Sequence, residues 1–183
     1  MKKLVIALST VLALGAVGTA SAQSGTITFN GNVTATTCEV QFPGNGGAVS
    51  DPTVTLPIVT TASLSQPGIP AGRKPVMIQI GTSTAPCSIG NTVALELNPT
   101  RNAQLTEGRL TNLAPVDSAA TNVVVALRDA NDAEIDLRVP WQSARETFDN
   151  GIATIAFSGE YYATGAATAG EVTANVQYTL DYQ

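Results

Sequence analysis

The sequence alternates between apolar and polar residues over one stretch near each of its ends. From residue 172 to residue 183 every even position is apolar and every odd position is polar. A similar stretch covers residues 25–35, where Ile27, Phe29 and Val33 alternate with threonines and asparagines. Successive side chains of a β-strand point to opposite faces, so each stretch predicts a strand with one buried face. Because a strand needs a hydrogen-bonding neighbour, both stretches must pair within this chain or with another one.

The first 22 residues have the three regions of a secretory signal peptide. Lys2 and Lys3 form a basic start, residues 4–17 are apolar, and Ala20-Ser21-Ala22 is a small-residue cleavage site. The apolar run is shorter than the roughly 20 residues that a transmembrane helix needs. We therefore expect removal of this leader and export of a mature chain, residues 23–183, which has the length of one domain.

The exported part of the chain is acidic. The full sequence carries 9 basic and 14 acidic residues and has no histidine. Removal of Lys2 and Lys3 leaves a net charge of −7, and such a surface repels nucleic acids and anionic lipids. Without histidine, the common catalytic triads and histidine-ligated metal sites are excluded. We therefore expect no enzymatic activity, no metal and no cofactor.

Two groups of carboxylates are alternative candidates for a site. Residues 129–136 resemble a calcium-binding loop, but the glycine and the final glutamate of such a loop are missing. The pairs Asp149 with Glu146 and Glu160 with Glu171 have the residue types of a glycosidase, but no pattern places either pair across a cleft. A polar turn and solvated surface charge explain these residues better.

Between the two ends, short β-rich runs are separated by turn residues. This spacing predicts an all-β fold, an antiparallel sandwich of immunoglobulin type. Residues 67–75 are expected to form a loop, and residues 141–150 a loop or one helical turn. Residues 135–139 are expected to pair with residues 123–127 as a hairpin. The predicted strands are residues 25–35, 54–59, 76–80, 92–97, 105–113, 123–127, 135–139, 151–163 and 172–183.

Cys38 and Cys87 are the two cysteines of the sequence, and both lie in the exported part. No C-x-x-C motif is present, and the lack of histidine argues against a metal site. In an oxidising compartment one structural disulfide is the expected outcome. Closing a loop of about 50 residues would stabilise the fold by roughly 4 kcal/mol.

Four features of the exported part occur together. The alternating residues 25–33 are followed five positions later by Cys38, and the second cysteine lies in Ala85-Pro86-Cys87. A strand-turn-strand pattern covers residues 123–137, and the chain ends with Gly170 fourteenth from the end and a penultimate Tyr182. Taken together, they resemble the structural subunits of chaperone–usher fimbriae, the pilins of type 1 and P pili. The resemblance covers essentially all of the mature chain.

The resemblance implies an immunoglobulin-like sandwich that lacks its last strand. Residues 34–183 would form this incomplete domain, and residues 23–33 would be donated to another subunit. A periplasmic chaperone would fill the groove first, bind the Gln183 carboxylate, and deliver the subunit to an outer-membrane usher. The product would be a fimbrium on the bacterial cell surface that supports adhesion, with identical or related pilins as partners and without nucleic acid binding or membrane insertion.

The resemblance also assigns residues to these roles. The donor strand would present Gly25, Ile27, Phe29, Gly31 and Val33. The acceptor groove and chaperone-binding surface would consist of Gly170, Val172, Val176, Tyr178, Leu180, Tyr182 and Gln183.

The residues alone leave other functions open. Ile27 and Phe29 could pack on the chain's own core, which would make a secreted, self-complete β-sandwich that binds a ligand. A minor sugar-binding adhesin is a further class, although tip adhesins carry an additional lectin domain for which 161 residues leave no room. The sequence does not distinguish a major shaft subunit from a minor adaptor. Nor does it give the register of the donor strand, the host receptor, the tip adhesin or the rod architecture.

Overall fold

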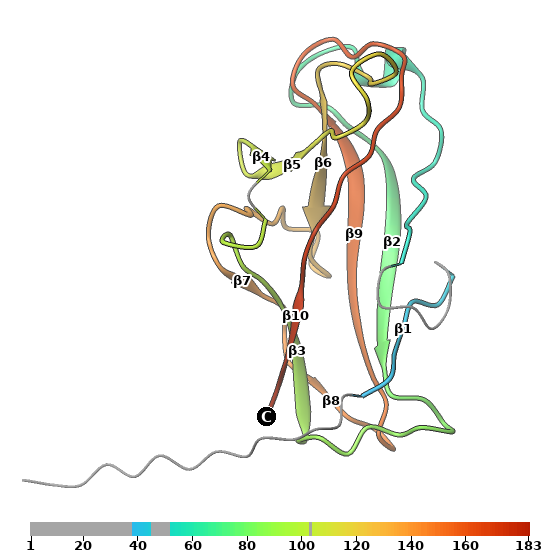
Figure 1. Ribbon diagram of the computed structural model, residues 1–183, viewed down its shortest axis with the longest axis vertical. Helices are drawn as coiled ribbons and strands as arrows, with labels where there is room; N and C mark the ends of the chain where they lie inside the picture. Colours follow the sequence, from blue (N-terminus) through green and yellow to red (C-terminus); the bar gives the residue numbers. More distant parts are fainter. Residues whose placement is uncertain (1–37, 45–51, 103) are drawn as a thin grey trace, which may run out of the picture. The chain divides into compact units, whose positions relative to one another are not determined.

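The computed structural model describes residues 38–44, 52–102 and 104–183, all within the unit formed by residues 35–183. The regular elements of this part are β-strands and one short 3-10 helix, η1 (Thr61–Leu64). Figure 1 shows the strands arranged in two sheets. The predicted all-β fold is confirmed. No helix in the described ranges is long and apolar enough to cross a membrane.

The larger sheet has six antiparallel strands in the order β1-β2-β9-β6-β5-β4. Its longest pair is β2 with β9, each of 11 residues, in a register that places Ile78 opposite Ile155. The strands are β1 (Val40–Gln41), β2 (Pro70–Ile80), β4 (Leu105–Thr106), β5 (Arg109–Thr111), β6 (Val123–Arg128) and β9 (Ala153–Ala163).

The smaller sheet is built around one strand, β3, to which the three others pair antiparallel. One side of β3 pairs with β10 near the chain's end, and the other side pairs with β7 and β8. The strand β10 therefore lies at an edge of this sheet. The strands are β3 (Thr92–Leu97), β7 (Trp141–Gln142), β8 (Glu146–Thr147) and β10 (Thr179–Tyr182).

The two sheets bury a common core. Ile78 and Ile155 of the larger sheet belong to the same buried cluster as Val93 and Leu95 of β3. A second cluster joins Leu97 of β3 to side chains of β5 and β6. Shared clusters mean that the sheets pack face to face, which is the sandwich that the strand spacing predicts.

The loop predicted over residues 67–75 is wrong, because β2 begins at Pro70. A bulge between Ala71 and Lys74 interrupts the pairing with β9, and Gly72 there has φ +65°. Glycine adopts this left-handed conformation without a steric penalty. The strand therefore continues through a stretch whose proline and glycine content is typical of a loop.

Two further predictions differ from the structure. Residues 141–150 contain β7 and β8, which are two residues each and therefore too short to show alternation. Residues 135–139 form no strand, although Ile135 and Leu137 are buried. Their hairpin pairing with β6 is reduced to one bridge, between Arg128 and Glu134. The turn before it is held by the Asp129 carboxylate, which accepts two backbone hydrogen bonds.

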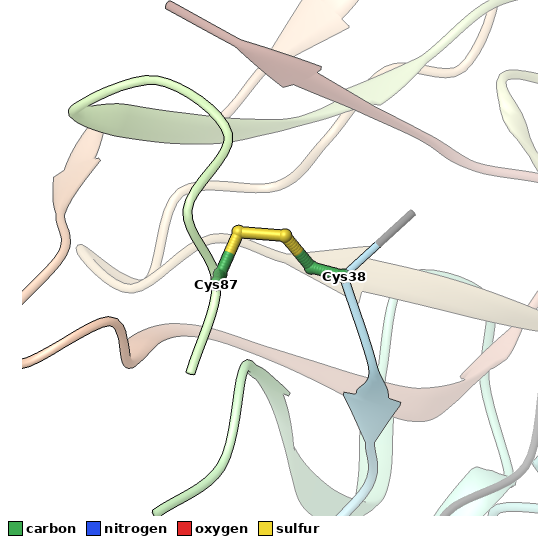
Figure 2. The surroundings of a disulfide bond; sticks show 2 residues. All are labelled: Cys38 and Cys87. Atoms are coloured by element: carbon green, nitrogen blue, oxygen red, sulfur yellow. A yellow bond between two sulfur atoms is a disulfide. The ribbon is translucent and has the colours of Figure 1, made fainter. Parts of the chain in front are cut away.

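The predicted disulfide between Cys38 and Cys87 is confirmed (Figure 2). It connects the segment before β1 to the loop between β2 and β3, with Cα atoms 5.1 Å apart. Gly81 is the first residue of this loop, and it packs closely against Gly151. A Cβ atom on Gly81 would lie 2.0 Å from the carbonyl oxygen of Gly151.

A buried carboxylate joins three strands on the outer face of the larger sheet. The Glu160 side chain on β9 is 3% exposed and accepts from Arg73 Nε of β2 at 2.9 Å and from Arg128 Nε of β6 at 2.5 Å. Asp132 contacts both arginines. Each buried oxygen thus has a charged donor, which offsets the desolvation of the carboxylate.

Replacing Glu160 by glutamine is expected to lower the free energy of unfolding by about 2 kcal/mol or more, because it removes the buried counter-charge of two arginines and leaves them only the exposed Asp132. The unfolding midpoint in guanidinium, followed by Trp141 fluorescence, measures the change. Asp117 is exposed and has no ion pair in the described ranges, so Asp117→Asn is the control. Equal midpoints for both variants would contradict the stabilising role of Glu160.

Candidate functional site

Residues 172–178, which lead into β10, alternate between half-buried and exposed side chains. We call this stretch the C-terminal edge. Its half-buried members pack on the core, as the alternation predicts; they are Val172, Ala174, Val176 and Tyr178. Strand pairing, however, is confined to β10. The continuous strand predicted over residues 172–183 is therefore wrong for residues 172–178.

One side of the C-terminal edge is hydrogen-bonded. The N–H of Thr173 donates to Asn112 Oδ1 at 3.0 Å, and its carbonyl accepts from the N–H of Leu113 at 2.7 Å. The N–H of Gln177 donates to Asn102 Oδ1 at 2.7 Å, and its carbonyl accepts from Asn102 Nδ2 at 3.0 Å. Two asparagine side chains thus take the place of a neighbouring strand.

The opposite side of the C-terminal edge is unpaired at three positions, as far as the described residues are concerned. In an extended chain the N–H and C=O groups of one residue point to one side and those of the next residue to the other. The groups of Val172, Ala174 and Val176 therefore point away from the two asparagines. None of these groups has a hydrogen-bond partner among the residues that the structure describes.

A second unpaired stretch, residues 52–59, precedes η1, and we call it the N-terminal edge. Its side chains also alternate, with Val54 and Leu56 half-buried and Thr53 and Thr55 exposed. Within the described ranges this stretch makes no backbone hydrogen bond. The strand predicted over residues 54–59 is therefore wrong, because none of the described strands pairs with this stretch.

The two edges lie over the same core. Three clusters of buried side chains make up the described core, and each receives side chains from both edges. The cluster that the start of the N-terminal edge contacts is the one that the end of the C-terminal edge contacts, and the reverse holds at the other end. The two edges therefore run antiparallel. We call the space between them the seam. The residues that share a cluster are Val54 with Tyr178, Leu56 with Ala174 and Val176, and Val59 with Val172.

A cavity of about 400 Å³ lies at one end of the seam. Ile58 and Val59 line it from the N-terminal edge, and Gly170 and Val172 line it from the other side. The Ile58 side chain is fully exposed. The cavity is large enough for a bulky apolar side chain supplied by another segment.

Two features coincide along the seam. Backbone groups on both edges are unpaired in the described ranges, and half-buried apolar side chains alternate with exposed ones, which are the features that an added β-strand would need. Within the described ranges no group of three or more His, Cys, Asp or Glu side chains could hold a metal ion.

The C-terminal carboxylate is bound within the chain itself. One Gln183 oxygen accepts hydrogen bonds from the N–H groups of Asn91 at 2.5 Å and Thr92 at 2.9 Å. Gly90, with φ +68°, permits this approach, since a Cβ atom there would lie 2.5 Å from the same oxygen. The group that the resemblance assigns to a chaperone thus has hydrogen-bond donors within this chain.

The remaining predicted groove residues lie in β10. Leu180 pairs with Leu95 and Tyr182 with Val93, while both side chains face the core. The Tyr182 ring stacks on Phe148 with centroids 6.4 Å apart. Burial raises the pKa of the Tyr182 hydroxyl, and the neighbouring Tyr178 adds to the rise. The phenol therefore stays neutral at physiological pH.

Some predicted residues lie outside the described ranges, and some functional ones were not predicted. The predicted donor residues Gly25, Ile27, Phe29, Gly31 and Val33 all lie outside the described residues. The sequence does not indicate that the N-terminal edge borders the seam, nor does it indicate the contacts of Asn102, Asn112 and Gly90. Single asparagines and glycines in turns carry no pattern that would distinguish them from ordinary turn residues.

The family model described as "Fimbrial protein" matches residues 27–183. The chain belongs to the fimbrial protein family. The major fimbrial subunit SMF-1 of Stenotrophomonas maltophilia is 38% identical over 170 residues, which cover 89% of this chain and 95% of that protein. The type-1 fimbrial protein A chain of Escherichia coli is 34% identical, with 97% and 93% of the two chains covered.

Solved structures of fimbrial subunits have the same fold. The P pilus rod subunit PapA has a TM-score of 0.52 at 14% identity, covering 73% of this chain and 94% of that one. A subunit from a chaperone–usher pilus structure also has a TM-score of 0.52 at 14% identity, with 88% and 96% covered. The fimbrial subunit described here therefore has the immunoglobulin-like fold of pilins.

Replacing Gly90 by alanine is expected to displace the C-terminal carboxylate, because the added Cβ would overlap with it. Amide exchange at Thr92 should accelerate, and the free energy of unfolding should fall by about 1–3 kcal/mol. Gly44 also has a positive φ, +79°, but no atom lies within 4 Å of its Cβ position. Gly44→Ala therefore controls for backbone strain, and an equal loss in both variants would argue against the carboxylate site.

Proposed function

We propose that this fimbrial subunit is non-catalytic and polymerises by accepting a β-strand from the next subunit into its seam. The observation that carries the proposal is the pair of unpaired edges over one core. A sandwich with two open edges above its core has incomplete backbone pairing and partly exposed apolar side chains. An added strand would correct both defects at once.

The donated strand in this proposal is residues 23–33. Its alternation places Ile27 and Phe29 on one face, where each would contribute about 1.5–3 kcal/mol on burial. Backbone hydrogen bonds to the two edges would add roughly 0.5–1.5 kcal/mol each. Gly25 on the same face would allow close approach of the backbone, and Gly31 or Val33 would end the insertion.

The proposal includes the delivery of the subunit. Residues 1–22 would direct export to the periplasm, where a chaperone would fill the seam and so prevent aggregation through the open edges. An outer-membrane usher would then receive the subunit and extend the fibre on the cell surface. The internal site for the Gln183 carboxylate would be vacated in the chaperone complex and occupied in the fibre.

Replacing Ile27 or Phe29 by aspartate is expected to abolish fibre formation, because an unpaired charge cannot be buried in the seam. The chaperone complex should still form, since the chaperone would use the seam and not the donor strand. Electron microscopy of cells and co-purification with the chaperone measure the two effects. Thr28→Asp, on the opposite face of the strand, is the matched control. Normal fibres from the Ile27 and Phe29 variants would show that another segment fills the seam.

The main alternative is a self-complete secreted β-sandwich, in which the chain's own residues fill the seam. Size-exclusion chromatography of the exported chain, with and without a co-expressed chaperone, separates the two functions. The proposal predicts a soluble one-to-one complex that slowly converts to heat-resistant polymers. A stable monomer that unfolds cooperatively without a chaperone would favour the secreted binding protein. A sugar-binding adhesin subunit would additionally bind carbohydrate as a monomer.

A further inference from the structure

The C-terminal edge is held in place by side chains rather than by a strand. Asn102 exchanges two hydrogen bonds with the backbone of Gln177, one through Oδ1 and one through Nδ2. This is the pair of bonds that a residue of a neighbouring strand would make. Asn112 accepts from the N–H of Thr173 four residues earlier. The two asparagines therefore hold the same side of the edge near its two ends.

Both side-chain amides use their full donor capacity. Asn112 Nδ2 donates to the carbonyls of Ala120 and Glu171, each at 2.9 Å, and Oδ1 also accepts from the N–H of Ala114 at 3.0 Å. The second proton of Asn102 Nδ2 goes to the carbonyl of Asn98 at 3.1 Å. Neither amide can rotate without losing several hydrogen bonds. The contacts therefore define one orientation of each side chain.

The two asparagines are anchored in different parts of the sandwich. Asn102 is 5% exposed and lies in the turn after β3, where its N–H donates to the carbonyl of Pro99. Asn112 directly follows β5 of the larger sheet. The C-terminal edge is thus fixed to both sheets, although it belongs to the ladder of neither.

An edge without these contacts would be costly to order. Fixing the backbone of one residue costs roughly 1–2 kcal/mol of conformational entropy, and residues 172–178 have no ladder in the described ranges to offset it. Their neighbours are held independently, Glu171 by its bridge to Ala119 and Thr179 by its pairing with β3. Between these two anchors, Asn102, Asn112 and the N–H of Leu113 hydrogen-bond the backbone of Thr173 and Gln177, and the asparagines supply three of these four bonds.

We propose that Asn102 and Asn112 are positioning residues for strand uptake. They hold the C-terminal edge extended, so that the N–H and C=O groups of Val172, Ala174 and Val176 face the seam before a strand arrives. The inference rests on the proposed function, since it concerns the same seam. It predicts that loss of either amide slows strand uptake, and does not merely weaken the completed sandwich.

Aspartate substitutions test the role with little change of shape. In Asn102→Asp an oxygen replaces the amide donor and faces the carbonyls of Asn98 and Gln177; in Asn112→Asp it faces those of Ala120 and Glu171. Asn122→Gly is the matched control, because Asn122 Nδ2 also bonds a backbone carbonyl, that of Ala166, in a loop outside the edge. Glycine tolerates the φ of +59° at this position. Asn102→Ser replaces the aspartate variant if that variant does not accumulate.

The experiment uses the exported chain, unfolded in guanidinium and refolded at low concentration. A fluorescein-labelled peptide of residues 23–35 is added in excess, and its association rate is followed by fluorescence anisotropy. We expect uptake to slow by about tenfold or more in both aspartate variants, and by less than about twofold in the control. Amide exchange at Thr173 and Gln177 should accelerate in the peptide-free aspartate variants.

Two measurements separate a positioning role from a purely structural one. Urea unfolding of the peptide-bound complex reports stability, and the association rate reports uptake. A lower urea midpoint with an unchanged association rate would overturn the positioning role. If the unmodified chain takes up no peptide, the proposed function itself fails, and the positioning role with it. If all variants take up the peptide at the same rate, the positioning role alone fails.

Discussion

The backbone pairing of the C-terminal edge is the constraint on which the rest of the structure depends. A strand beside a core needs partners on both sides, because unpaired N–H and C=O groups near a core are costly to leave unsatisfied. Here one side is satisfied by Asn102 and Asn112, and the other side faces the seam. The N-terminal edge, which lies over the same core, also has unpaired backbone groups in the described ranges. A single added strand would satisfy both.

The described parts of the sandwich beside the seam are fixed by strand pairing, ion pairs and the disulfide. The long β2–β9 pair and the buried Glu160 fix the larger sheet, and the disulfide fixes the start of the unit to the β2–β3 loop. The chain's end is fixed by β10 and by the amides that bind the Gln183 carboxylate. The two edges of the seam are therefore connected to elements with fixed positions, which would reduce the entropy lost on the proposed strand addition.

Much of the fold could be predicted because the relevant signals are local. Residues 92–97 and 123–127 were predicted as strands and are β3 and β6, since continuous apolar or alternating runs identify buried strands. The two-residue strands β7 and β8 could not be predicted, because their pairing with β3 leaves no periodicity in the sequence. Residues 54–59 alternate like a strand, yet no strand within residues 38–44, 52–102 and 104–183 pairs with them.

The sequence by itself determined the fold class, the disulfide and the buried face of residues 172–183. These follow from residue type and from a period of two, which are properties of the chain read in order. Only the tertiary structure decided which edges stay unpaired and what holds them. The partners of Thr173 and Gln177 are asparagines 61 and 75 positions away, and the internal site for the carboxylate lies in a distant turn. Hydrogen bonds between segments so far apart depend on how the two sheets pack, and a single sequence does not record that packing.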